Sequence, residues 1–458
     1  MKLYTGFENQ RILVLGLAKS GVSVAKLLND LGAFVTVNDQ KPLEENPQAQ
    51  ELVEAGIRVI TGSHPLELFE ESFACLVKNP GIPYSNPMIE KAIELGLPVY
   101  TEIEVAYRIL EGNLIGITGS NGKTTTTTIT SMILAEEFKN QKVFAAGNIG
   151  LPLSQLAETS TPSDFYVTEL SSFQLMGIEE FKPKIAAILN LSTAHIDYHG
   201  TREAYIEAKL RITENQKESD FLVYNADDAE LSQLVKTISA AKLIPFSRTK
   251  ALTLGAYSDE ENLYFNGEKV ISRTSIQVPG EQNVENILAA IAITKLLGVS
   301  NQAIQTAVEA FKGVKHRTQF VAEINSRRFY NDSKATNITA TQTALRSFGN
   351  KDIVLIAGGL DRGNGFEDLI PDLSSVETMV VYGQTKDKLR EAAETAHIPT
   401  IIQVDKLNQA VNLAYQNSQE GDIVLFSPAC ASWDQYENFE IRGDEFIQLV
   451  EQIANLEQ

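Results

Sequence analysis

The chain has 458 residues and carries 39 Lys and Arg against 59 Asp and Glu, a formal net charge of −20. A single domain rarely exceeds about 250–300 residues, so more than one hydrophobic core is expected. The excess of acid disfavours nucleic acids and anionic membrane surfaces as partners, and no apolar run approaches the ~18 residues that a membrane insertion needs.

The first block of the chain, residues 1–103, alternates short apolar runs with helical patterns, which predicts a parallel, doubly wound sheet. The expected strands and helices lie at 11–15, 20–31, 33–39, 58–60, 74–78, 87–95 and 99–100. Gly16 and Gly21 resemble a dinucleotide fingerprint but do not have its GxGxxG spacing. Asp39 ends the second strand, where an acid commonly meets a ribose or a base. These features favour a nucleotide-like ligand but not NAD specifically.

The segment Asn-Pro-Gly-Ile at 79–82 follows another strand of this block. Such a turn can bring backbone N–H groups to a diphosphate, although a plain turn is the more common explanation.

The second block, residues 104–313, begins with a strand at 114–118 that feeds the glycine-rich segment Gly119-Ser-Asn-Gly-Lys-Thr124 and then a helix. Glycines let backbone N–H groups point at phosphate oxygens, Lys123 can reach the β and γ phosphates, and the Thr124 hydroxyl can bind Mg²⁺. The ordinary P-loop has a further glycine where this chain has Ile117, so we expect a variant loop. The competing explanation is a tight strand–helix turn. Further strands are expected at 165–172, 185–192 and 221–227, with an edge hairpin within 251–278 and a helix at 279–298.

Two residues near strand ends of this block are candidates for metal chemistry. Glu169 has apolar neighbours, so an ionised carboxylate there needs a cation, although a paired structural glutamate is about equally plausible. His195 follows another strand end, where open α/β sheets place their ligands. A lone histidine is more often structural, and His199 is taken as structural.

The third block, residues 314–458, again alternates strands and helices. The polar segments 331–337 (NDSKATN) and 427–443 (SPACASWDQYENFEIRG) each follow a strand. Either segment could be a solvated loop. Because both are expected at the same sheet edge, a catalytic cleft between domains is the sharper hypothesis.

Taken together, these motifs resemble the Mur ligases over essentially the whole chain. TGSNGKTTT, GNIG (147–150), ELSSFQL (169–175), HIDYH (195–199), the AKLRI segment and NVENILAA (283–290) occur in a similar order. NDSKATN and SPACASWDQYENFEIRG are more specific and resemble the D-glutamate-adding members. The resemblance implies a Rossmann-like N-terminal domain that binds UDP, a central P-loop-type mononucleotide-binding α/β domain for ATP, and a C-terminal Rossmann-like α/β domain for the amino acid.

The resemblance also implies an ATP-dependent amide ligase of peptidoglycan precursor synthesis. The carboxylate of UDP-N-acetylmuramoyl-L-alanine attacks the γ-phosphate of ATP, and the amine of D-glutamate then attacks the acyl phosphate. Two Mg²⁺ ions are implied, with Thr124, Glu169, His195 and a carbamylated Lys209 as ligands. Lys123, His195 and Lys209 are the implied catalytic residues. An ordinary surface lysine is the alternative for Lys209.

By the same resemblance, the remaining site residues fall into two groups. The ATP-binding residues are Gly119, Ser120, Asn121, Gly122, Lys123, Thr124, Thr125, Asn283, Asn286, Arg317 and Asp332. The substrate-binding residues are Lys19, Ser20, Asp39, Asn79, Gly81, Asn148, Lys334, Thr336, Arg362, Ser432, Trp433 and Phe439. Arg362 stands in the segment where some members have a carboxylate-binding lysine, and Trp433 stands where leucine is also found.

The alternatives are a related ATP-dependent amide ligase with another acceptor and, from a different class, a P-loop switch or regulatory binding protein. A P-loop switch would not need the two polar segments of the third block. The glycine motif at residues 16–21 lacks the GxGxxG spacing, which disfavours an NAD oxidoreductase. The N-terminus lacks a signal-peptide pattern, and two cysteines, Cys75 and Cys430, make no disulfide framework. We therefore expect a cytoplasmic monomer with buried free thiols.

Overall fold

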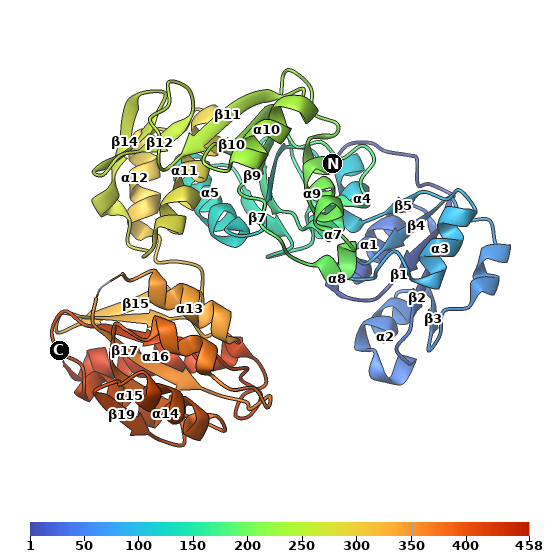
Figure 1. Ribbon diagram of the computed structural model, residues 1–458. Helices are drawn as coiled ribbons and strands as arrows, with labels where there is room; N and C mark the ends of the chain where they lie inside the picture. Colours follow the sequence, from blue (N-terminus) through green and yellow to red (C-terminus); the bar gives the residue numbers. More distant parts are fainter. Residues whose placement is uncertain (350, 458) are drawn as a thin grey trace. The chain divides into compact units, whose positions relative to one another are not determined.

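The computed structural model describes residues 1–349 and 351–457. They form three α/β sheets in two compact units (Figure 1). One unit contains residues 1–273 and 285–307, and the other contains residues 274–284 and the chain from 308 onward. The predicted fold class, three α/β domains with mostly parallel strands, is confirmed. The domain boundaries at 103 and 313 stay predictions, because the first two sheets share one unit.

The first sheet has five parallel strands in the order β3-β2-β1-β4-β5. Its strands are β1 (Arg11–Leu15), β2 (Phe34–Asp39), β3 (Arg58–Thr61), β4 (Cys75–Lys78) and β5 (Val99–Tyr100). Its helices are α1 (Lys19–Asp30), α2 (Pro47–Glu54), α3 (Pro87–Glu94) and α4 (Glu102–Ile109). The strand order reverses between β1 and β4, and ligands of such sheets bind beyond the carboxyl ends of strands at this point.

The second sheet has nine strands in the order β14-β13-β12-β11-β10-β9-β6-β8-β7. They are β6 (Asn113–Thr118), β7 (Val143–Gly147), β8 (Phe165–Glu169), β9 (Ile185–Ile188), β10 (Phe221–Asn225), β11 (Lys242–Ser247), β12 (Ala256–Ser258), β13 (Asn262–Phe265) and β14 (Glu268–Ser272). The antiparallel strands β12 to β14 confirm the predicted edge hairpin. The helices are α5 (Lys123–Glu137), α6 (Leu153–Ala157), α7 (Ser172–Leu175), α8 (Ile196–His199), α9 (Arg202–Leu210), α10 (Ala229–Ile238), α11 (Glu281–Leu296) and α12 (Asn301–Ala310).

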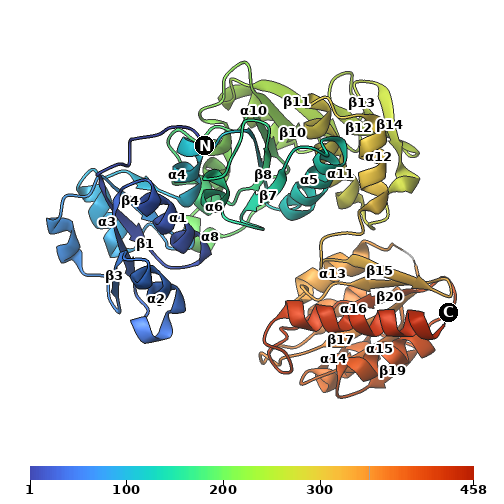
Figure 2. The ribbon, with the colours of Figure 1, turned by 180° about the vertical axis from the view of Figure 1, so that it is seen from behind.

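The third sheet has six strands in the order β15-β16-β20-β17-β18-β19, and only β15 runs antiparallel to its neighbour. They are β15 (Gln319–Ile324), β16 (Arg327–Asn331), β17 (Ile353–Gly358), β18 (Val376–Tyr382), β19 (Thr400–Gln403) and β20 (Ile423–Phe426). The helices are α13 (Ile338–Arg346), α14 (Lys386–Thr395), α15 (Leu407–Gln416) and α16 (Phe439–Leu456), of which α16 lies across the sheet (Figure 2).

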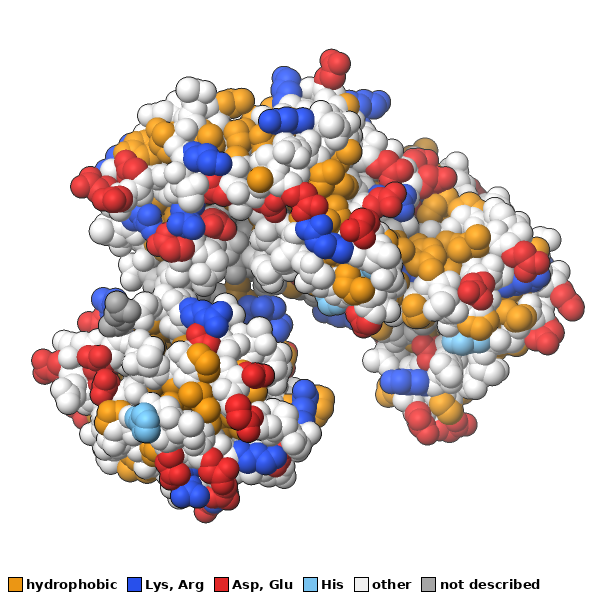
Figure 3. All heavy atoms as spheres, viewed as in Figure 1, with side chains coloured by type: hydrophobic (Ala, Val, Ile, Leu, Met, Phe, Trp, Pro, Cys, Tyr) orange, Lys and Arg blue, Asp and Glu red, His pale blue; other side chains and the backbone are white. Residues whose placement is uncertain are grey.

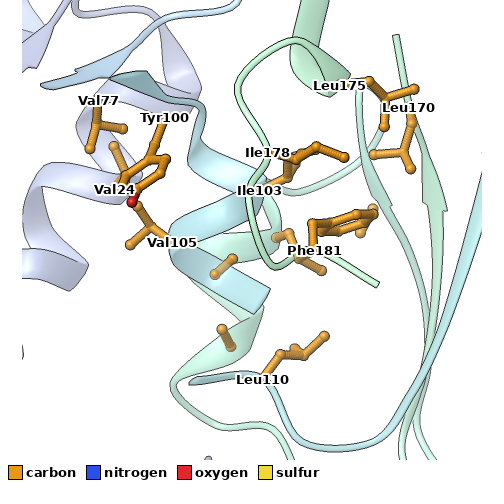
Figure 4. Packing of buried hydrophobic residues seen from close by; sticks show 14 of the residues in the cluster. Val24, Val77, Tyr100, Ile103, Val105, Leu110, Leu170, Leu175, Ile178 and Phe181 are labelled. Carbon is orange, nitrogen blue, oxygen red and sulfur yellow. The ribbon is translucent and has the colours of Figure 1, made fainter. Parts of the chain in front are cut away.

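Helix α4 joins the first two sheets in one hydrophobic core (Figure 4). Ile103 on α4 is fully buried, with Val77 and Tyr100 of the first sheet on one side and Leu170 and Phe181 on the other. A continuous core of this kind holds the ligand-binding edges of the two sheets in one rigid body, since close-packed interiors resist deformation.

The surface carries mixed charges, and both cysteines lie in the interior. Basic and acidic side chains are interspersed over the visible face, without a basic lobe (Figure 3). Cys75 and Cys430 are buried free thiols, as predicted. Among the helices formed by the described residues, none is long and apolar enough to cross a membrane.

Candidate active site

The glycine-rich segment forms the predicted connection between β6 and α5. Gly122 precedes the first turn of α5 with a left-handed φ of 81°, and a Cβ there would overlap the Asn286 side chain. Lys123 folds back over the loop, with Nζ 2.9 Å from the Gly119 carbonyl and 3.0 Å from the Ser120 carbonyl. The loop therefore presents an amine and the positive end of the α5 dipole at one place, which suits a polyphosphate.

Polar contacts with distant segments fix this loop from behind. The Ser120 hydroxyl donates to the Ser192 carbonyl at 2.8 Å and accepts from the Tyr205 hydroxyl at 3.0 Å. The Asn121 N–H donates to the Asn190 side chain at 2.9 Å. Predicted residues Thr124 and Thr125 lie half-buried in the first turn of α5. The loop is thus held in shape by its own protein before any ligand binds.

Glu169 ends β8 and pairs in register with Ile117 of β6, directly before the loop. Its side chain is 2% exposed. Asn148 donates to Glu169 Oε1 at 2.8 Å, whereas Oε2 is buried with no hydrogen-bond partner among the described residues. A buried carboxylate oxygen in that state is unfavourable unless a cation satisfies it. The carboxylate therefore fits a divalent metal at this position, and the predicted substrate-binding role of Asn148 stays a prediction.

Lys209 lies on α9 behind the same loop and is 2% exposed, so the alternative of an ordinary surface lysine is wrong. Its Nζ donates to the Gly119 carbonyl at 2.9 Å and lies 4.7 Å from the Tyr205 ring centroid. Burial, assisted by the charge of Lys123 and opposed by Glu169, lowers the pKa of Lys209 to about 7. A large fraction of this amine is thus neutral near neutral pH, which makes it nucleophilic.

His195 is exposed and precedes α8 in a left-handed conformation, with φ of 53°. Its ring meets Phe173 edge-on at 5.0 Å. His199 is more enclosed: its Nε2 lies 2.9 Å from the Ser172 hydroxyl, its ring stacks on Phe173, and burial lowers its pKa. Of the two histidines, His195 is the one exposed to a ligand. No group of three or more His, Cys, Asp or Glu in the described part of the chain is arranged to hold a metal ion.

The predicted residues of the first sheet gather at its carboxyl edge. The Asp39 carboxylate accepts from the N–H of Leu17 at 2.7 Å, and the Asn79 amide donates to the Ser20 hydroxyl at 3.1 Å. The N–H of Gly81 donates to the Asn79 side chain at 3.2 Å.

Lys19 reaches beyond this sheet, because its Nζ donates to the Gly150 carbonyl at 2.7 Å. The edge of the first sheet and the GNIG segment of the second sheet are therefore joined by a direct hydrogen bond.

Two residues near this edge were not predicted from the sequence. Lys78, the last residue of β4, is 1% exposed, and its Nζ lies 3.2 Å from both the Pro80 carbonyl and the Tyr198 hydroxyl. Burial lowers the pKa of Lys78 to about 7. In the sequence, Lys78 ends an apolar strand before a Pro-Gly turn and Tyr198 lies within the HIDYH segment, but neither position indicates that the two side chains meet.

The C-terminal unit contains the predicted ATP-binding residues Arg317 and Asp332. Asp332 is buried and accepts from the N–H of Thr318 at 3.0 Å and from the Ser427 hydroxyl at 2.8 Å. Burial raises the pKa of Asp332 to about 7, against the charge of Arg317, which is exposed. On α11, Asn286 lies 3.4 Å from the Thr126 hydroxyl, and Asn283 donates to the Pro279 carbonyl at 2.6 Å.

Four of the residues predicted to bind the amino acid form two cation–aromatic pairs. Lys334 Nζ lies 5.1 Å from the Phe439 ring centroid, and the Arg362 guanidinium lies 5.3 Å from that of Trp433. Ser432 beside Trp433 is buried, whereas Thr336 is half-buried. Arg362 is exposed, and its role in binding a carboxylate stays a prediction.

Arg442 on α16, within the polar segment 427–443, is completely buried. It donates to the Ser333 carbonyl at 2.8 Å, to the Ser333 hydroxyl at 3.1 Å and to the Cys430 carbonyl at 3.1 Å. Because Ser333 and Cys430 belong to the two polar segments, one guanidinium ties these segments together at the same sheet edge.

Comparisons with known proteins agree with this arrangement. The chain matches the N-terminal domain of MurD-like Mur ligases over residues 10–101, the Mur ligase middle domain over 117–294 and the Mur ligase glutamate ligase domain over 316–430. It is 54% identical to a UDP-N-acetylmuramoylalanine–D-glutamate ligase of Geobacillus kaustophilus, covering 99% of this chain and 100% of that protein. The corresponding ligase of Enterococcus faecalis is 51% identical, with both chains covered completely.

A solved structure shares the fold at low sequence identity. The MurF ligase of Thermotoga maritima in complex with ADP superposes with a TM-score of 0.55 at 19% identity, covering 92% of this chain and 96% of that one. The full-length relatives, the three matched domains and the P-loop with its buried glutamate lead to one conclusion: the chain belongs to the Mur ligase family.

Proposed function

We propose that this protein is an ATP-dependent ligase that joins D-glutamate to UDP-N-acetylmuramoyl-L-alanine, a step in making the peptidoglycan precursor. The observation that carries the proposal is the buried, unpartnered Glu169 Oε2 beside the P-loop, in a chain whose full-length relatives bear the name of this ligase. We place the reaction in the cytoplasm and the active form as a monomer. Analytical ultracentrifugation with and without substrates tests the monomer.

Phosphoryl transfer needs positioning and charge neutralisation more than covalent help from the protein. Lys123 and the amides of residues 119–125 hold the β and γ phosphates of ATP, with Asn283 and Asn286 on the adenine side. Arg317 and Asp332 bind phosphate and ribose. The substrate carboxylate attacks the γ-phosphorus, ADP leaves, and the resulting acyl phosphate is then open to the amine.

Two Mg²⁺ ions would be held by Thr124 and Glu169 and by His195 and a carbamylated Lys209. When bound, they would neutralise charge on the transferring phosphoryl group. The protein's own contribution to the second position is the neutral amine of Lys209, since only an unprotonated lysine reacts with carbon dioxide. The carbamate would turn a cation into a carboxylate-like ligand.

The two substrates are recognised at separate places. Lys19, Ser20, Asp39, Asn79 and Gly81 would hold the UDP part of the first substrate, and Asn148 would contact its other end. The D-glutamate carboxylates would meet Lys334 and Arg362. The side chains that shape this second pocket are those of Thr336, Ser432, Trp433 and Phe439.

Phosphate release in the presence of ATP and Mg²⁺ tests the function. We expect release to require UDP-N-acetylmuramoyl-L-alanine and D-glutamate together, and Lys123→Ala to abolish it. Release supported by L-glutamate or a diamino acid in place of D-glutamate would instead show another amide ligase of the family. Nucleotide binding without turnover under any of these conditions would favour a P-loop switch.

A further inference from the structure

Lys78 and Tyr198 form a polar contact between the edge of the first sheet and helix α8 of the second. Tyr198 Oη lies 3.1 Å from the Pro80 carbonyl and 3.0 Å from the Ile82 carbonyl, and it accepts from Lys78 Nζ at 3.2 Å. The same lysine donates to the Pro80 carbonyl at 3.2 Å. One hydroxyl and one amine thus contact two carbonyls of the turn at 79–82, those of Pro80 and Ile82.

Aromatic rings surround the contact and lower the local dielectric, which strengthens its hydrogen bonds. Lys78 is 1% exposed, and its Nζ lies 4.9 Å from the Tyr84 ring centroid. Tyr198 packs edge-on against Phe173 at 4.4 Å. The Tyr84 hydroxyl makes a second link by donating to the Met176 carbonyl at 3.1 Å. Hydrogen bonds in a low-dielectric setting hold their groups more tightly than exposed ones do.

The two ends of this contact adjoin two parts of the proposed site. On one side is the turn that carries Asn79 and Gly81, the proposed UDP contacts. On the other side, α8 is a single turn that directly follows His195, and the N–H of Tyr198 donates to the His195 carbonyl at 3.2 Å. A displacement of Tyr198 therefore moves His195.

We propose that Lys78 and Tyr198 are positioning residues that fix the separation between the UDP-binding turn and His195. This rests on the proposed function, in which one nucleotide-sugar substrate spans both places. The pair touches neither reacting atom. It sets the distance that a ligand must bridge, so it matters for the complete substrate and not for UDP alone.

Titration calorimetry with the full-length protein tests this proposal. Tyr198→Phe keeps the ring and removes the hydroxyl. We expect its Kd for UDP-N-acetylmuramoyl-L-alanine to rise about fivefold, the effect of one hydrogen bond, while its Kd for UDP changes less than twofold. Lys78→Met should have the same effect, and the double variant should be no weaker than the weaker single variant. Tyr264→Phe, which removes a hydroxyl on β13 that donates to Asp259, is the matched control.

Two outcomes would overturn the positioning role: an unchanged Kd for the whole substrate in Tyr198→Phe, or an equal loss for the substrate and for UDP. Failure of the wild-type protein to bind the substrate would refute the proposed function instead. In that case, hydrogen exchange of the backbone amides, measured without any ligand, still tests whether Tyr198 holds the two segments in place. Backbone amides of both segments, 79–82 and 195–199, should exchange faster in Tyr198→Phe than in the wild-type protein. Faster exchange confined to 195–199 would contradict the positioning role of the pair.

Discussion

Replacing Asp332 by asparagine should stabilise the C-terminal unit in a way that depends on pH. The carboxyl group is 7% exposed, and its partners are the N–H of Thr318 and the hydroxyl of Ser427. Asparagine has the same shape and can keep both contacts. The asparagine oxygen can accept from the N–H of Thr318, and the asparagine NH₂ group can donate to the Ser427 hydroxyl. The Ser427 hydroxyl can then donate its own proton to the Thr341 hydroxyl, which lies 2.9 Å away.

The magnitude follows from the pKa of Asp332, which burial raises from 3.8 to about 7. Between these values the folded protein binds a proton that the unfolded chain has lost, so stability falls as the pH rises through this window. From pH 5 to pH 8, the wild-type unit should lose about 2–3 kcal/mol through this one group. The asparagine variant cannot titrate and should lack this loss.

Urea unfolding followed by tryptophan fluorescence measures the effect, because Trp433 is the chain's only tryptophan and lies in the same unit. The difference between variant and wild type should be small at pH 5 and grow in favour of the variant by pH 8. Titrations of all other groups cancel in this comparison. A difference that stays constant from pH 5 to pH 8 would show that the carboxyl is already ionised at pH 5.

The remaining predictions concern catalysis. Glu169→Gln should lower kcat at least about a hundredfold and raise the Mg²⁺ concentration needed for half-maximal activity. Full activity with an unchanged Mg²⁺ dependence would contradict a metal-binding role for Glu169. Lys209→Ala should be inactive and partly rescued by short carboxylates; full activity, or a defect that ignores these additives, would exclude the carbamate. Arg362→Ala should raise KM for D-glutamate about tenfold and leave the KM for ATP unchanged, and an unchanged KM for D-glutamate would remove its assignment.

The P-loop and the sheets were predictable because their signals are local. Apolar strands, glycines and helical periodicity lie within a few residues of one another, and Gly122 has the left-handed conformation and close neighbour that only glycine tolerates. Glu169 was predictable as a candidate because an acid in an apolar strand needs a partner. The absence of a hydrogen bond to its Oε2, which favours a cation over a paired structural role, required the three-dimensional structure.

Contacts between distant segments could not be predicted from local patterns. Lys78 and Tyr198 are separated by 120 positions, and Arg442 meets Ser333 across 109. The packing of the first two sheets into one unit also depends on contacts between distant segments. The Glu104 carboxylate on α4 is fully buried and accepts from the backbone N–H groups of residues 179–181, although glutamate on a helix usually indicates an exposed face.

The net charge of −20 is therefore a poor guide to the ligands of this protein. Acidic side chains on the surface are separated from a bound ligand by water and salt, which weaken their repulsion. Positive groups lie at the site itself: Lys123 is half-buried and folds over the P-loop at the N-terminus of α5. At equal distance, a charge in such surroundings acts several times more strongly than one in water. An acidic chain can bind ATP, a nucleotide sugar and an acidic amino acid because nearby cations and helix dipoles, not the charge count, dominate the potential at each site.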